Sequence, residues 1–348
     1  MPFPEFESDK KKILFFSRGR GRGHAIPDAE IVRSLTAFRE DIDVRIASYG
    51  GGAATFEQLG MPLIDLGLPE AGSIVEMSVL AGKLIGWLNP DLVVSHEEFA
   101  ALPAAKIFDR RTVFLTDWLI EQEYYSMAAL KFADQILFLG PRGIFDEPPW
   151  VSDKIRYLGP LLRQFRFAAG DRDRARAELG ISLEAWVLSV FPGSWREANT
   201  PILDPVIEAF DALDYPEKIL VWLAGADCEH VQARLAGRSD SRVLEYDWQI
   251  DRLMVASNAA ITKTNRKALF ELQYLQIATV AISFELNPAD DRAAAALPNV
   301  TRVRGKGLNG DFLAAEIRTL LARPLEQCPL SFCSAQDCAK LLCDALTN

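Results

Sequence analysis

Short apolar runs rich in β-branched and aromatic residues alternate with helical patterns along the whole chain, and this alternation constrains the fold most. Alternation of this kind is typical of parallel sheets built from βαβ units. Ala29 to Phe38 is the clearest early helix, because Ile31, Leu35 and Phe38 fall on one face. The sequence therefore predicts an α/β fold. In the first half we predict strands at 12–17, 43–49, 91–95, 112–117 and 135–140.

The second half repeats the pattern. A charged helix at 172–179 ends at Gly180 and is followed by predicted strands at 186–191, 218–224, 243–246, 259–263 and 279–284. A chain of 348 residues also exceeds the size at which single cores usually stop growing, about 250 to 300 residues. The Gly- and Pro-containing segment 158–166 is the predicted linker. We expect one domain at 1–160 and a second at 161–348. The last helix of the chain could pack back on the first domain.

Composition and charge indicate which binding partners and which cellular location to expect. The net charge is −10, which argues against general nucleic-acid binding, since that needs clustered Lys and Arg. A secretory signal begins with basic residues that are followed by an apolar core. The first twelve residues instead contain acids and a late lysine cluster, so we expect a cytoplasmic protein. No apolar run approaches the roughly 20 residues that are needed to span a membrane. A peripheral contact with a membrane is compatible with the sequence. Five cysteines without a Cys-x-x-Cys pair favour free thiols.

A glycine-rich turn from Ser17 to Pro27 follows the first predicted strand. Its candidates for phosphate or acceptor contacts are Arg20, Gly21, Arg22 and Gly23, because glycines allow close backbone approach and a helix start attracts anions. A dinucleotide fingerprint would need glycine where His24 stands, and a Walker A loop needs a Gly-Lys-Ser/Thr ending. Both motifs are excluded.

His24 is one of three histidines and sits at the predicted helix start, where the helix dipole disfavours the imidazolium. This position suits a general base acting on a hydroxyl. A hydrogen-bonded turn histidine is the alternative. Asp117 ends another predicted strand and could orient His24, or it could cap a helix before Trp118.

The segment Gly21-Arg-Gly-His24-Ala-Ile-Pro27 resembles the first loop of MurG-type N-acetylglucosaminyltransferases and related GT-B enzymes, which reads Gly-Gly-His-x-x-Pro. The segments 89–95 and 113–117 are similar to that family's middle strands in order and spacing. The resemblance implies two Rossmann-like domains whose parallel sheets face a central cleft, with the acceptor side first and the nucleotide-sugar side second. One departure is His96-Glu-Glu-Phe99, which replaces the family's glycine-rich second loop.

The loop from Pro192 to Pro201 stands where the resembled family opens its donor domain. Gly193 and Ser194 could donate hydrogen bonds to a diphosphate, and Arg196 could supply charge-assisted bonds. A plain βα turn is the alternative. Thr200 is the predicted N-cap of the following helix, with Pro201 at its first position.

A second candidate donor loop runs from Thr262 to Leu272. A helix start with Lys263, Thr264, Asn265, Arg266 and Lys267 can stabilise the charge of a departing diphosphate without a metal. The resemblance implies that Glu271 holds the ribose hydroxyls. Asn265 replaces the family's glycine, which allows a less close approach of phosphate.

Asp290 and Asp291 follow the next predicted strand, in the loop that contacts the donor sugar in the resembled family. A solvated turn is the alternative. The leading hypothesis is an inverting, metal-independent glycosyltransferase that uses a nucleotide sugar, with UDP the favoured nucleotide, no cofactor and an unidentified hydroxyl acceptor. The alternatives are a nucleotide-sugar hydrolase of the same fold and a non-catalytic nucleotide-sugar-binding protein.

Overall fold

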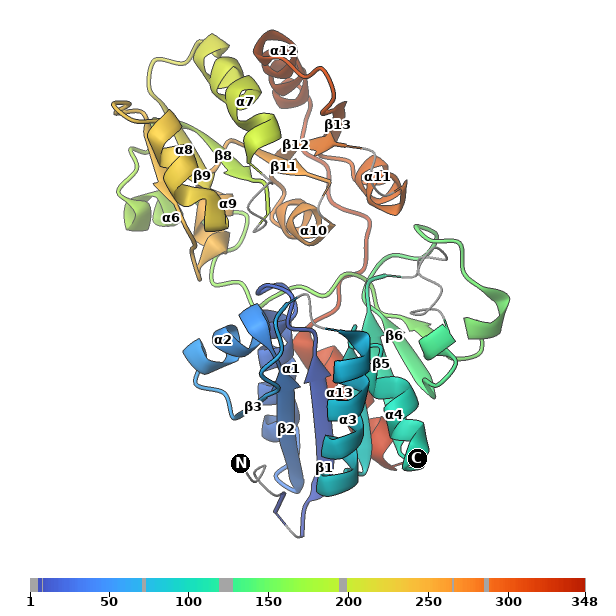
Figure 1. The fold of residues 1–348 in the computed structure, drawn as a ribbon. Helices are drawn as coiled ribbons and strands as arrows, with labels where there is room; N and C mark the ends of the chain where they lie inside the picture. Colours follow the sequence, from blue (N-terminus) through green and yellow to red (C-terminus); the bar gives the residue numbers. More distant parts are fainter. Residues whose placement is uncertain are drawn as a thin grey trace. The chain divides into compact units, whose positions relative to one another are not determined.

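The computed structural model describes residues 6–7, 9–70, 73–118, 128–193, 199–264, 266–284 and 288–347. The chain forms two compact units, shown in Figure 1: Met1–Gln164 with Leu330–Asn348, and Phe165–Pro329. We predicted the boundary after residue 160, whereas the structure places it after Gln164 and returns the chain to unit 1 at Leu330.

Unit 1 is built on a parallel sheet with the strand order β3-β2-β1-β4-β5-β6-β7. Its strands are β1 (Lys11–Ser17), β2 (Ile42–Ser48), β3 (Leu63–Asp65), β4 (Leu92–His96), β5 (Arg111–Thr116), β6 (Gln135–Phe138) and β7 (Ile155–Tyr157). Its described α-helices are α1 (Ala25–Phe38), α2 (Gly50–Gln58), α3 (Ile74–Leu88), α4 (Ala101–Ile107) and α13 (Ala335–Thr347), with a 3-10 turn η1 at Pro149–Val151.

Both faces of this sheet are covered, which explains the continuous apolar run of β1. Successive side chains of a strand point to opposite faces. Ile13 and Phe15 accordingly pack with residues of α1 and α13, and Leu14 and Phe16 pack with residues of α3 and α4. All four side chains are fully buried, and Figure 1 shows the two helix layers around β1.

The C-terminal segment is held in unit 1 by backbone contacts that a glycine permits. Cys333 donates its backbone N–H to Pro160 and accepts from Leu162, at 2.9 and 3.0 Å. Gly159 has a positive φ of 84°, and a Cβ added there would lie 1.9 Å from the Ser331 carbonyl oxygen. Only glycine fits this crossing.

The C-terminal cysteines carry free thiols, as we predicted. Cys338 on α13 is buried, and its Sγ lies 3.4 Å from the Sγ of Cys333. Cys333 precedes α13, whereas Cys338 and Cys343 lie within the helix.

Unit 2 is a second parallel sheet with the order β10-β9-β8-β11-β12-β13. Leu188 and Val190 of β8 pack with residues of α7 and α12, whereas Val187 packs with α9 on the other face. The strands are β8 (Trp186–Phe191), β9 (Lys218–Leu223), β10 (Ser241–Leu244), β11 (Ala259–Lys263), β12 (Ala278–Ser283) and β13 (Val300–Arg304). Its described helices are α6 (Arg172–Leu179), α7 (Thr200–Ala212), α8 (Cys228–Arg234), α9 (Ile250–Ala256), α10 (Arg266–Tyr274), α11 (Pro288–Ala295) and α12 (Gly310–Leu321), with a 3-10 turn η3 at Gly225–Asp227.

The predicted long strands are confirmed with small shifts at their ends. β3, β7 and β13 were not predicted, because they are three to five residues long and lack an apolar run. The first helix begins at Ala25 rather than Ala29. Asn199 stands at the N-cap position of α7, whereas we predicted Thr200 there. In the part of the chain that the structure describes, no helix is long and apolar enough to cross a membrane.

Candidate active site

Three neighbouring strands of unit 1 bring polar residues to one edge of the sheet. The register pairs Ser17 of β1 with His96 of β4, and His96 with Leu115 of β5. Because adjacent parallel strands end at the same edge, the loops that follow them lie together. The loop after β1 leads to His24 at the start of α1, and Glu97 directly follows β4.

Glu97 is the centre of this arrangement. One carboxylate oxygen, Oε2, lies 3.0 Å from His24 Nε2 and 3.2 Å from Arg18 Nη1. The other, Oε1, accepts from the Thr116 hydroxyl at 3.0 Å and from the Asp117 backbone N–H at 3.3 Å. Four donors therefore fix a carboxylate that is only 3% exposed.

The surroundings keep Glu97 ionised. Burial by itself would raise its pKa, but the charge and hydrogen bond of His24, with the charges of His96 and Arg18, hold the pKa of Glu97 well below its usual value. Since an ionised carboxylate can only accept, Nε2 of His24 carries the shared hydrogen. Glu97 also has a positive φ of 55°, and such strain in a non-glycine residue is common at functional sites.

A second histidine pair lies beside the first. His96 Nδ1 is 2.6 Å from Asp28 Oδ1, and the Ser17 hydroxyl donates to the other Asp28 oxygen at 2.6 Å. His96 is 1% exposed and Asp28 is fully buried. The rings of His24 and His96 are in edge-to-face contact, with centroids 4.6 Å apart and planes at 83°.

Glu98 has the opposite electrostatic behaviour to its neighbour Glu97. It accepts from the Tyr49 hydroxyl at 3.1 Å, and burial raises the pKa of Glu98. Burial, helped by Glu98, also raises the pKa of Tyr49 to about 12. The loop after β4 thus carries one carboxylate held ionised and one that takes up a proton more readily than usual.

The glycines of the first loop make close contact with the start of α2. A Cβ on Gly19 would lie 2.1 Å from the Tyr49 carbonyl oxygen, and a Cβ on Gly52 would lie 2.9 Å from the Gly19 Cα. We predicted that the glycines of the first loop bring the backbone close to a ligand. The structure shows that Gly19 and Gly52 bring the first loop close to the start of α2, and the contact of Gly21 and Gly23 with phosphate stays a prediction.

A carboxylate occupies part of the predicted phosphate or acceptor loop. Glu70 Oε1 accepts from the backbone N–H groups of Gly21 at 3.3 Å and Gly51 at 3.1 Å, and Arg20 Nε donates to the Glu70 carbonyl at 3.2 Å. Arg22 donates to Gln58 at 2.9 Å. An anionic group that uses the Gly21 N–H would have to displace Glu70.

His24, His96 and Glu97 could in principle present atoms to a metal ion, since one ligand atom from each lies within 4.8 Å of the others. Two features favour a hydrogen-bonded proton site instead. The oxygens of Glu97 already accept four hydrogen bonds, and Arg18 brings a positive charge to the same carboxylate. The expectation of a metal-free site stays a prediction.

In unit 2, Lys263 ends β11 and Thr264 follows it. Lys263 is half-buried, which lowers its pKa, and its Nζ lies 5.4 Å from the centroid of the Phe284 ring. Thr264 donates its backbone N–H to Ile282 at 3.2 Å. Gly193, after β8, has a φ of 102°. The predicted donor residues Ser194, Arg196 and Asn265 lie outside the described residues.

The remaining predicted donor residues are partly engaged in ion pairs. Arg266 Nε lies 2.7 Å from Asp290 Oδ1, and Arg302 Nη1 lies 3.2 Å from Asp291 Oδ2. Glu271 in α10 is only 6% exposed. The structure thus joins Arg266 to Asp290, and the predicted contacts of these residues with sugar and ribose stay predictions.

Sequence reasoning found His24 but missed Glu97 as a partner of its ring. We predicted that Asp117 orients His24, whereas the carboxylate on Nε2 belongs to Glu97, which also accepts the Asp117 backbone N–H. The role of the Asp117 side chain stays a prediction. The sequence contained a signal for Glu97, because Glu97 directly follows the apolar strand that ends at His96, and parallel strands end at the same edge of a sheet.

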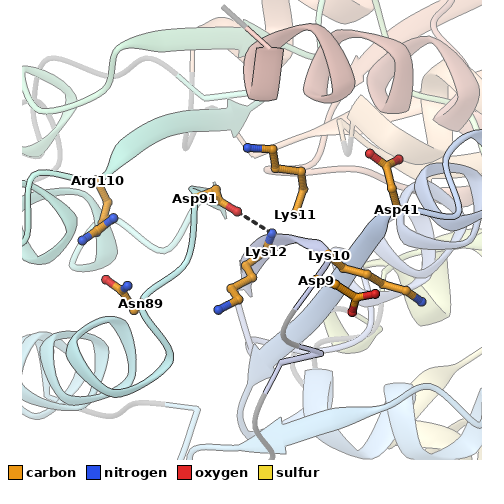
Figure 2. Close-up of a pocket in the computed structure, with 8 residues that line it drawn as sticks. All are labelled: Asp9, Lys10, Lys11, Lys12, Asp41, Asn89, Asp91 and Arg110. Atoms are coloured by element: carbon orange, nitrogen blue, oxygen red, sulfur yellow. Dashed lines mark hydrogen bonds between the residues drawn. The ribbon is translucent and has the colours of Figure 1, made fainter.

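A hollow of about 350 Å³ lies at the opposite, amino end of β1. Figure 2 shows its lining, in which the Lys12 backbone N–H donates to Asp91 at 2.8 Å. Both lysines and aspartates line this hollow, and Lys10 Nζ lies 2.9 Å from Glu7 Oε2. Since ligands of open α/β sheets bind at the carboxyl ends of the strands, we place the candidate site at the His24 edge.

Comparison with solved structures identifies the fold. The glycotransferase of kitacinnamycin aligns over 97% of this chain and 100% of its own, with 18% identity and a TM-score of 0.68. MurG of Acinetobacter baumannii aligns over 96% and 99%, with 13% identity and a TM-score of 0.67. The chain has a MurG-like GT-B fold.

The same GT-B architecture is found in another enzyme class. UDP-GlcNAc 2-epimerase of Methanocaldococcus jannaschii, in complex with UDP-GlcNAc and UDP, aligns over 97% of this chain and 100% of its own, with 13% identity and a TM-score of 0.66. No protein-family model and no curated protein sequence matches this chain. The GT-B fold is therefore shared by neighbours that differ in their reactions.

Proposed function

We propose that this GT-B protein is a nucleotide-sugar-dependent glycosyltransferase, with His24 as the base and a UDP-sugar as the donor. The observation that carries the proposal is the His24–Glu97 pair at the carboxyl edge of the first sheet. A buried carboxylate on Nε2 orients the imidazole and stabilises the imidazolium that forms when the ring takes a proton. An acceptor hydroxyl deprotonated in this way can attack the anomeric carbon of the donor as the diphosphate leaves.

Unit 2 supplies the chemistry expected for the leaving group. Lys263 is a half-buried cation at the carboxyl end of β11, and α10 begins three residues later at Arg266. Positive charge at a helix start stabilises a developing diphosphate without a metal. Ligands of GT-B neighbours support the donor class, since epimerases of this fold have been solved with UDP-GlcNAc.

An epimerase acting on a UDP-sugar is the second candidate. Its support is the similarity to UDP-GlcNAc 2-epimerases together with two adjacent buried carboxyl groups, Glu97 and Glu98, whose pKa values shift in opposite directions. When the pKa values of two neighbouring carboxyl groups are shifted apart, one group can serve as a base and the other as an acid. Product analysis separates the candidates, because an epimerase changes the sugar and keeps it attached to UDP.

The test is incubation with a panel of nucleotide sugars, with release of nucleoside diphosphate measured in the presence and absence of hydroxyl acceptors. We expect release from a UDP-sugar that increases when an acceptor is added. His24→Gln should lower the rate by about 10²- to 10⁴-fold. His230→Gln is the matched control, because His230 is an exposed histidine in α8.

Each other outcome selects an alternative. Release that no acceptor increases would favour a hydrolase, and a melting-temperature increase without any turnover would favour a non-catalytic binding protein. If no nucleotide sugar is bound or consumed, or if His24→Gln keeps the rate of His230→Gln, the proposal is wrong.

A further inference from the structure

The face of α3 that points away from the sheet is apolar. Val75, Val79 and Trp87 are 66%, 51% and 59% exposed, although the opposite face of the helix packs on the sheet of unit 1. Figure 1 shows α3 and α4 side by side in one helix layer of this unit. Single exposed apolar side chains are ordinary, whereas several on one helix face mark an interaction surface.

The surface continues onto the end of α4. A Cβ added to Gly86 would lie 2.8 Å from Phe108 Cζ, so the Phe108 ring lies directly on α3. Phe108 and its neighbour Ile107 are both exposed. Gly82, one turn before Gly86, has open space around it and therefore allows another helix to approach closely. We call the exposed face of α3, together with Ile107 and Phe108, the α3 surface.

Two opposite charges lie on the same side of this helix. Glu76 and Lys83 are the only charged residues of α3, and both are exposed. They are seven residues apart, which places them within about 20° of each other around the helix and about 10 Å apart along its axis. Only side chains three or four residues apart meet on a helix. The two charges therefore cannot neutralise each other within α3.

An antiparallel copy of α3 can satisfy both charges at once. If a twofold axis passes between Val79 and Leu80, midway between Glu76 and Lys83, Glu76 of each copy faces Lys83 of the other. The two copies of Val79 then meet at the axis, and Val75 lies opposite the turn that contains Gly82. The pattern is self-complementary, as a twofold interface between identical chains requires.

A lipid surface fits this face less well. Helices that lie on membranes carry several Lys or Arg around their apolar face, whereas α3 has one lysine and one glutamate. The net charge of −10 also opposes binding to anionic lipids. One acid and one base on the same side of a helix favour a protein partner with the same pattern, and a second copy of this chain carries it.

We propose that the chain forms a twofold homodimer through the α3 surface, with the two α3 helices antiparallel, Val79 at the centre and the pairs of Glu76 with Lys83 at the edge. Burial of the apolar side chains provides the association energy, because exposed ion pairs contribute little. The charges fix the direction of the helices, since a parallel arrangement would place like charges together. The dimer does not depend on the proposed function, and its test does not use turnover.

Val79→Asp tests the centre of the interface. The full chain is sedimented over a range of concentrations, and we expect the parent protein to be a dimer at micromolar concentrations. Val79→Asp brings two carboxylates together at the twofold axis and should weaken association by more than about 100-fold. Leu183→Asp is the matched control, because Leu183 in unit 2 is 53% exposed, close to the value for Val79. The control should dimerise like the parent.

Charge reversals test the direction of the helices. Glu76→Lys gives the face two lysines and Lys83→Glu gives it two acids, so each variant alone should associate at least about tenfold more weakly than the parent. When the two variants are mixed, the lysines of one copy face the acids of the other, and a heterodimer should form. The double variant Glu76→Lys/Lys83→Glu restores both pairs and should dimerise like the parent.

Folding of each variant is checked by its melting curve, since Glu76 also accepts the Ser73 backbone N–H at 3.3 Å. If Glu76→Lys does not fold, Val79→Asp and Lys83→Glu still test the interface. A monomeric parent, a Val79→Asp variant that dimerises like Leu183→Asp, or folded charge-reversal variants that stay monomeric when mixed would overturn the proposal.

Flotation with vesicles of phosphatidylcholine and phosphatidylglycerol tests the lipid alternative. We expect no binding of the parent protein to these vesicles. A monomeric chain that floats with them, and that loses this binding in Val79→Asp but not in Leu183→Asp, would assign the α3 surface to a membrane and overturn the dimer.

Discussion

Glu97→Gln tests the reasoning about the candidate site most directly. The substituted amide can keep an oxygen toward Thr116 and the Asp117 N–H, but its NH₂ group then faces the donors of His24 and Arg18. Hydrogen bonds to charged groups contribute about 1.5 to 3 kcal/mol each, so losing two costs about 3 to 6 kcal/mol. Arg18 is 23% exposed and regains some water, which reduces the expected loss of unfolding free energy to about 2 to 4 kcal/mol.

The pH dependence of this loss has a definite sign. Because the folded pKa of Glu97 lies well below the reference value of 4.5, the stabilisation by Glu97 is complete above that reference and is lost as the pH falls through the folded pKa. Urea unfolding at pH 7 should therefore show the full difference between the parent and Glu97→Gln. The two stability curves should converge in acid.

Glu98→Gln is the matched control one residue away. The raised pKa of Glu98 means that its ionised form is disfavoured by the fold, so a neutral amide should change the unfolding free energy at pH 7 by less than about 1 kcal/mol. If Glu97→Gln were as stable as Glu98→Gln at pH 7, and retained turnover, the assignment of Glu97 as the ionised partner of His24 would be wrong.

Three further predictions concern the rest of the chain. Gly159→Ala should lower the free energy of unfolding, measured with urea, by more than about 2 kcal/mol, because the added Cβ would clash with the Ser331 carbonyl oxygen at a residue with positive φ. Gly143→Ala is the control, because Gly143 has a similar φ but open space around it. Lys263→Gln should weaken UDP binding about tenfold, measured by calorimetry, because the half-buried cation would no longer contact phosphate. Lys306→Gln, at an exposed position, is the control and should bind UDP like the parent. Equal UDP affinities of the two variants would refute the phosphate role of Lys263. Treatment with EDTA should leave nucleotide release unchanged, and loss that zinc or magnesium restores would refute the metal-free mechanism.

The sequence by itself determined the parallel α/β class and the positions of the long strands. Buried parallel strands are apolar on both faces, so runs such as Lys12 to Ser17 and Trp186 to Phe191 are visible without any tertiary information. The order of loops also pointed to GT-B, and it singled out His24 because a histidine at a helix start stands out locally. These features depend on neighbouring residues in the chain.

Only the tertiary structure decided which groups meet. Glu97 reaches His24 across 73 positions of sequence because β1 and β4 are adjacent in the sheet, and strand order is not encoded in any local pattern. The return of Cys333 to Pro160, and thus the place of α13 in unit 1, depends on the same kind of long-range packing. The folded surroundings determine which side chains a buried charge contacts. The sequence could therefore nominate Asp117, but only the folded sheet revealed that Glu97 contacts His24.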